Sequence, residues 1–83
     1  MKKTIRVTQE LIDNGQKIDA ACCPVALALK KEVDPKASCG DTSCYLGKRY
    51  GRHELPQAVI TFVKAFDKGL PVEPFEFEID LPD

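Results

Sequence analysis

With 83 residues, 43% of them hydrophobic, and only four phenylalanines and two tyrosines, the chain has enough apolar material for one core, so we expect a single domain over residues 1–83. Its 12 basic and 13 acidic residues give a net charge of -1, which excludes a general electrostatic attraction to nucleic acid or anionic membranes. No apolar run approaches the length of about eighteen residues that marks a membrane span, and no apolar segment follows the basic start. We therefore expect a protein of a bacterial cytoplasm, with reduced thiols and no membrane partner.

The N-terminal segment predicts a strand followed by a short helix. Ile5 and Val7 alternate with polar neighbours, which is typical of a strand with one buried face. Thr8 is a suitable N-cap for the helix, and Asn14-Gly15 is expected to end it after about two turns.

The pair Cys22-Cys23 precedes Pro24, a residue that favours the first position of a helix. Cys23 is then the expected N-cap of an apolar helix that ends at Asp34-Pro35, because the residue before a proline avoids helical geometry. A helix N-terminus lowers the pKa of a thiol, so Cys23 is a candidate reactive thiol with Cys22 as its resolving neighbour. The alternative is that both thiols only pack and cap.

Residues 37–50 are expected to form a hairpin. A loop of two or four residues would place Cys39 and Cys44 on the same face of it. We expect no metal and no cofactor, with zinc as the alternative, because the spacing of Cys39 and Cys44 is at the upper limit for zinc ligands and the adjacent Cys22 and Cys23 do not form a usual ligand pair.

A basic run interleaved with aromatic residues follows the hairpin turn and is expected to continue the strand or form an exposed loop. Such side chains contact phosphates and stack on bases, which makes nucleic-acid binding an alternative function. The residues are Tyr45, Lys48, Arg49, Tyr50, Arg52 and His53.

The clearest pattern is a helix that starts at Pro56. Val59, Phe62, Val63 and Phe66 fall at the spacing of a single apolar stripe. Gly69 is expected to adopt a left-handed cap after which Leu70 folds back on the helix.

The C-terminal segment alternates Phe75, Phe77, Ile79 and Leu81 with acidic residues, which predicts a half-buried strand. Flanking prolines favour a position at the edge of a sheet. An edge strand has backbone groups free to pair with another chain, and its acids either guard that edge or select a basic partner. A homodimer through this edge is an alternative to a monomer.

Several segments resemble small phage- and prophage-encoded proteins of uncharacterised activity: IRVTQE at 5–10, CPVALA at 23–28, residues 62–69, and PVEPFEF at 71–77. The resemblance spans most of the chain and implies a compact stand-alone domain without bringing catalytic residues. Similar sequences carry Cys-x-x-Cys-Pro where this chain has DAACCP at 19–24, which argues against a common metal or redox role for the first cysteine.

Together these patterns predict an α+β fold, in which a small, mostly antiparallel sheet of the N-terminal strand, central hairpin and C-terminal strand packs against two main helices and one short helix. The expected function is that of a non-enzymatic phage-type accessory protein that binds another macromolecule, in particular a protein. Nucleic-acid binding, and a zinc-stabilised or thiol-reactive domain, are the alternatives. Candidate partner-binding residues are Lys48, Arg49, Tyr50, Arg52, His53, Glu76, Glu78 and Asp80; the alternative zinc ligands are Cys22, Cys23, Cys39 and Cys44.

Overall fold

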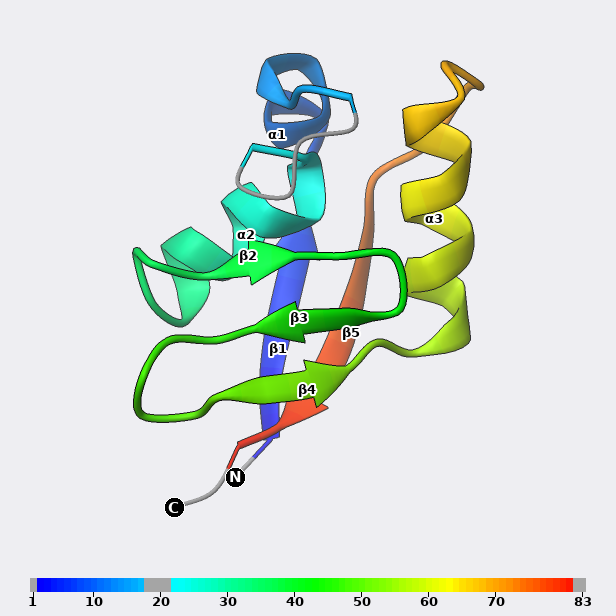
Figure 1. Cartoon of the computed structure of the whole chain (residues 1–83). Coiled ribbons are helices and arrows are strands. Elements are labelled where there is room, and N and C mark those ends of the chain that lie inside the picture. The colour runs from blue at the N-terminus through cyan, green and yellow to red at the C-terminus, as the bar shows by residue number, and fades with distance from the viewer. Residues whose placement is uncertain (1, 18–21, 82–83) are drawn as a thin grey trace.

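A computed structural model of the chain describes residues 2–17 and 22–81 (Figure 1). Its elements in chain order are β1 (Lys2–Val7), α1 (Gln9–Asn14), α2 (Pro24–Glu32), β2 (Ser38–Cys39), β3 (Ser43–Tyr45), β4 (Arg52–Glu54), α3 (Gln57–Asp67) and β5 (Phe75–Asp80). They build a body of 36 × 21 × 18 Å with two antiparallel sheets, which confirms the predicted α+β class. Residues 19–21, where the chain differs from the phage proteins it resembles, lie outside the described residues. None of the described helices is long and apolar enough to cross a bilayer.

The strands form two sheets rather than the single one that the sequence suggested. β1 and β5 pair with each other, from Lys2 opposite Asp80 to Val7 opposite Phe75. β2, β3 and β4 form the second sheet, whose strands run across β1 and β5 in the view of Figure 1. Both sides of β3 are occupied because the chain reverses after it and pairs β4 alongside, so the hairpin does not extend the terminal sheet.

That reversal resolves the alternatives for the basic run: its first part forms a turn and its last part is a strand. Gly47 and Gly51 have φ values of 92° and 69°, which glycine adopts at little cost. The Gly51 N–H donates to the Gly47 carbonyl at 2.8 Å, and the Leu46 N–H donates to the Gly51 carbonyl at 2.8 Å. Arg52–Glu54 then pairs with Ser43–Tyr45.

Both predicted helix caps in the N-terminal half are present. The Thr8 hydroxyl accepts a hydrogen bond from the Leu11 N–H at 3.3 Å, and the Cys23 sulfur accepts one from the Ala26 N–H at 3.4 Å. Pro24 occupies the start of α2 as expected. α2 lies against both sheets, and a Lys3–Glu32 ion pair at 3.9 Å joins it to β1.

The apolar stripe of α3 is buried as predicted, and the Phe62 ring lies 4.7 Å from the Phe75 ring of β5. Gly69 adopts the predicted positive φ of 77°, and the Leu70 N–H donates to the Ala65 carbonyl at 3.0 Å. The expected return of Leu70 onto the helix is wrong, since this side chain is 54% exposed. Phe75 instead packs against that part of the core, because the chain returns along α3 toward β5.

Candidate functional site

The outer face of the terminal sheet carries the three acidic candidates opposite residues of β1. Glu76 faces Arg6, with an ion pair of 3.5 Å between Nε and Oε2, and Asp80 faces Lys2. Glu78 faces the uncharged Thr4. The acids therefore serve first to hold the register of β1 and β5, and Glu78 is the one placed opposite a neutral side chain.

The two long edges of this sheet are not equivalent. β1 is flanked by α2, which the Lys3–Glu32 pair holds in place. β5 pairs with no strand but β1 among the described residues, which confirms the predicted edge position. In Figure 1, α3 lies beside the start of β5, where Phe62 meets Phe75.

Two hollows lie along β5 and the segment that leads into it. One of about 380 Å³ separates α3 from residues 71–75 and is lined mainly by apolar side chains, among them Ala58, Phe62, Val72 and Phe75. The second, of about 400 Å³, is lined by Thr4, Glu76, Phe77 and Glu78. An apolar recess is thus followed along the same strand by one with two carboxylates, and sequence periodicity had indicated only the alternation within β5.

The basic run is divided between two surfaces. Lys48 and Arg49 are exposed in the turn, and the Arg49 guanidinium lies 5.3 Å from the centre of the Tyr50 ring. Arg52 faces Tyr45 across β3 and β4 on the exposed side of the second sheet.

His53 does not join these cations. It lies opposite Cys44, and its Nε2 is 3.0 Å from the Tyr50 carbonyl oxygen. This contact holds the half-buried imidazole against the turn, so the predicted grouping of His53 with Arg52 on one binding surface is not formed.

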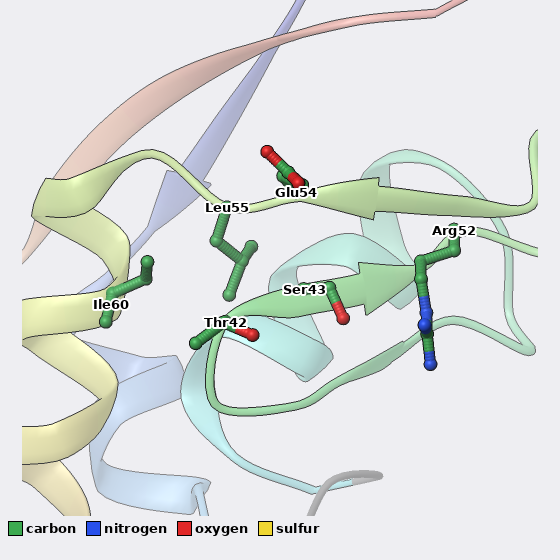
Figure 2. Close-up of a pocket in the computed structure, with 6 residues that line it drawn as sticks. All are labelled: Thr42, Ser43, Arg52, Glu54, Leu55 and Ile60. Atoms are coloured by element: carbon green, nitrogen blue, oxygen red, sulfur yellow. The ribbon is translucent and has the colours of Figure 1, made fainter.

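A further pocket of about 380 Å³ lies where the second sheet meets α3, lined by Thr42, Ser43, Arg52, Glu54, Leu55 and Ile60 (Figure 2). The charged ends of Arg52 and Glu54 point away from each other in this view. Specific small-molecule sites need polar groups that converge on one point, and these two do not.

Three of the four cysteines meet between α2 and the second sheet. Cys39 and Cys44 are directly opposite each other on β2 and β3, as the prediction of an even loop required. Cys23 reaches the same place from the N-terminus of α2 and hydrogen-bonds with Cys39. The exposed fractions of Cys23, Cys39 and Cys44 are 4%, 3% and 2%, and no disulfide joins any of the four cysteines.

The surroundings give these thiols different acidities. The hydrogen bond from Cys39, with the help of the Ala26 N–H, lowers the pKa of Cys23 from 9.0 to about 7, although burial acts to raise it. The same hydrogen bond and burial raise the pKa of Cys39. Burial raises the pKa of Cys44 to about 11. Asp67 of α3, which the sequence did not connect with the cysteines, opposes ionisation of both Cys23 and Cys39.

The alternative zinc site groups Cys22, Cys23, Cys39 and Cys44. Within residues 2–17 and 22–81, no three or more histidine, cysteine, aspartate or glutamate side chains are arranged to hold a metal ion. Zinc-specific geometry therefore gives no support to this alternative.

Comparisons with protein-family models, curated proteins and solved structures give no significant match to this chain. The resemblance to phage-encoded proteins consequently stays a prediction, and function has to be argued from the surfaces described above.

The ionisation of Cys23 should appear in the pH dependence of stability. Between about pH 7 and pH 9 the folded protein holds a Cys23 thiolate while the unfolded chain holds a thiol, so stability should rise with pH in this interval and this contribution should be lost as pH falls through 7. Cys44 acts oppositely between about pH 9 and pH 11, because the folded state keeps its proton longer.

Urea unfolding of the reduced wild type and of Cys23→Ala at several pH values checks this expectation. The stability difference between the two proteins should grow from about pH 6 to about pH 9. A constant difference across that range would show that Cys23 stays protonated in the folded state.

Proposed function

We propose that this chain is a non-enzymatic binding module that accepts an extended segment of a partner protein along the free edge of β5. The observation that carries the proposal is that β5 pairs on one side only, with β1, while hollows line its course from residue 71 to residue 78. A strand added to such an edge gains main-chain hydrogen bonds, and adjacent recesses select its side chains.

The chemistry of the partner follows from the two faces of β5. Glu76 and Glu78 project to the exposed face, whereas Phe77 and Ile79 point into the core. A strand laid alongside would place every second side chain near the carboxylates and the others near the apolar edge of the core. We therefore propose a partner segment that alternates basic and apolar residues.

The same charges argue against self-association through this edge. Two copies of β5 paired together would bring the acidic residues of both chains onto one face, and like charges opposite each other destabilise a strand pair. We accordingly propose a monomer in which the acids reject a second copy and accept a basic segment.

A designed peptide of about twelve residues that alternates lysine and valine tests this proposal. It should bind the protein, and an otherwise equal peptide of glutamate and valine should not. Reversal of both charges in Glu76→Lys/Glu78→Lys should weaken binding by at least about tenfold, since each reversal replaces an attractive neighbour by a repulsive one. Glu54→Lys, on the exposed face of β4, is the matched control and should bind like the wild type.

Backbone methylation separates strand addition from simple charge attraction. Two versions of the lysine–valine peptide carry N-methyl groups on alternate residues, so that the methyl groups lie on one edge or on the other. Strand addition predicts that one version loses binding while the other keeps it. Equal binding of both versions, or equal binding to the charge-reversed variant, would refute the proposal.

A further inference from the structure

The three buried thiols are not equivalent, and their hydrogen bonds show how they differ. The Cys23 sulfur is an acceptor at the N-terminus of α2, where the Ala26 N–H donates to it at 3.4 Å. Cys39 is its partner on β2, and the Cys39 sulfur also lies 3.4 Å from the Gly40 carbonyl oxygen, a direction in which only a protonated thiol can donate. The arrangement therefore suits a Cys23 thiolate beside a Cys39 thiol.

Cys44 offers a competing geometry. It is directly opposite Cys39 in the antiparallel register, which is also a position from which a disulfide can form. Its surroundings favour the protonated form, however, because burial dominates there. Neither member of the Cys39–Cys44 pair supplies the thiolate that starts thiol oxidation, whereas Cys23 does.

We propose that Cys23 and Cys39 form a redox site, in which Cys23 reacts with hydrogen peroxide and Cys39 resolves the product to a disulfide between α2 and β2. In the first step the Cys23 thiolate attacks one peroxide oxygen, the O–O bond breaks, hydroxide leaves, and Cys23 becomes a sulfenic acid. In the second step the Cys39 sulfur attacks the Cys23 sulfur and the S–O bond breaks. The departing hydroxide takes the Cys39 proton as water, and the net reaction converts two thiols and one peroxide into one disulfide and two waters.

The site lies away from β5, and its role does not depend on the proposed peptide-binding edge. A Cys23–Cys39 bond would tie the first residue of the α2 cap to the end of β2 and restrict the unfolded chain. The oxidised protein should accordingly unfold at a higher urea concentration than the reduced protein. A dithiol reductant returns the site to two thiols by exchange.

Peptide mapping after treatment of the reduced protein with a small excess of peroxide tests the assignment. Trypsin cleaves after Lys17, Lys30, Lys36 and Lys48, so residues 18–30 and 37–48 are separate peptides. The proposal predicts that these two peptides become joined, with the loss of two hydrogens, and are released again by reductant. A bond between Cys39 and Cys44 would instead remain inside the 37–48 peptide.

Variants then identify the cysteines that react. The joined peptide should persist in Cys22→Ser and in Cys44→Ala and should be absent from Cys23→Ala. In Cys39→Ala a sulfenic acid at Cys23 should accumulate and react with dimedone. The proposal is overturned if the cross-link persists without Cys23, if the bond forms within 37–48, or if the folded wild type gains no cross-link. The wild-type map decides the question even if a variant fails to fold.

Discussion

Replacement of Phe62 by alanine should lower the free energy of unfolding by about 3–5 kcal/mol. The Phe62 side chain is buried, its ring lies 4.7 Å from the Phe75 ring, and its stacked neighbour Phe66 lies 6.3 Å away on the same helix. Truncation would remove the contact that joins α3 to β5 and leave a cavity between them. A domain of this size is stabilised by only about 4–12 kcal/mol, so the variant is expected to be largely unfolded at moderate temperature.

Urea denaturation followed by circular dichroism measures this loss. Thr61→Ala is the matched control, because Thr61 is the preceding residue of α3 and is exposed. It should change the free energy of unfolding by less than about 0.5 kcal/mol. A Phe62→Ala protein as stable as Thr61→Ala would mean that α3 does not pack on β5 as described.

Gly47→Ala should be the second most damaging change, at about 2–4 kcal/mol. Gly47 has a φ of 92°, which an alanine adopts only with strain, and an added Cβ would also clash with the Asp34 carboxylate. Asp34 cannot simply move aside, because its side chain accepts the Lys36 N–H at 2.8 Å and its carbonyl accepts the Ala37 N–H at 2.9 Å. The turn after β3 is thus packed against the loop that follows α2.

Gly51→Ala isolates the packing part of this effect. Gly51 also has a positive φ, of 69°, but no atom lies within 4 Å of the position its Cβ would occupy. We expect a loss of about 1–2 kcal/mol from backbone strain alone, measured in the same urea experiment. If the two variants were equally stable, the close approach of Gly47 to Asp34 would be contradicted.

Local signals in the sequence were sufficient for the helices. Thr8, Cys23 and Pro24 mark helix starts through side-chain and backbone chemistry that depends on only a few neighbouring residues. The stripe from Val59 to Phe66 predicts the buried face of α3 because its spacing matches the helical repeat.

Strand pairing depended on longer-range geometry that the same rules do not contain. The alternation in β1 and β5 predicts two half-buried strands, but nothing local states that Lys2 pairs with Asp80 rather than with the hairpin. The third strand at Arg52–Glu54 is short and follows two glycines, so its pattern is compatible with both a strand and a loop.

The candidate sites divide along the same line. The Cys39–Cys44 register followed from the parity of one turn, whereas the contact of Cys23 with Cys39 requires α2 to lie on the second sheet. Likewise Tyr45 meets Arg52 through strand pairing, while His53 turns to the opposite face and bonds to Tyr50. The hollow beside α3 is formed by residues 71–75 folding back along the helix, a path that their proline-rich sequence does not specify.

The most direct test of the proposed β5 docking edge is a two-dimensional amide NMR titration of the reduced protein with the lysine–valine peptide. Strand addition predicts that the largest shift changes follow residues 72–80 and the facing part of α3, and that amides on the outer edge of β5 become protected from hydrogen exchange. Changes confined to residues 45–53, or no change at a peptide concentration that saturates other binding assays, would contradict it.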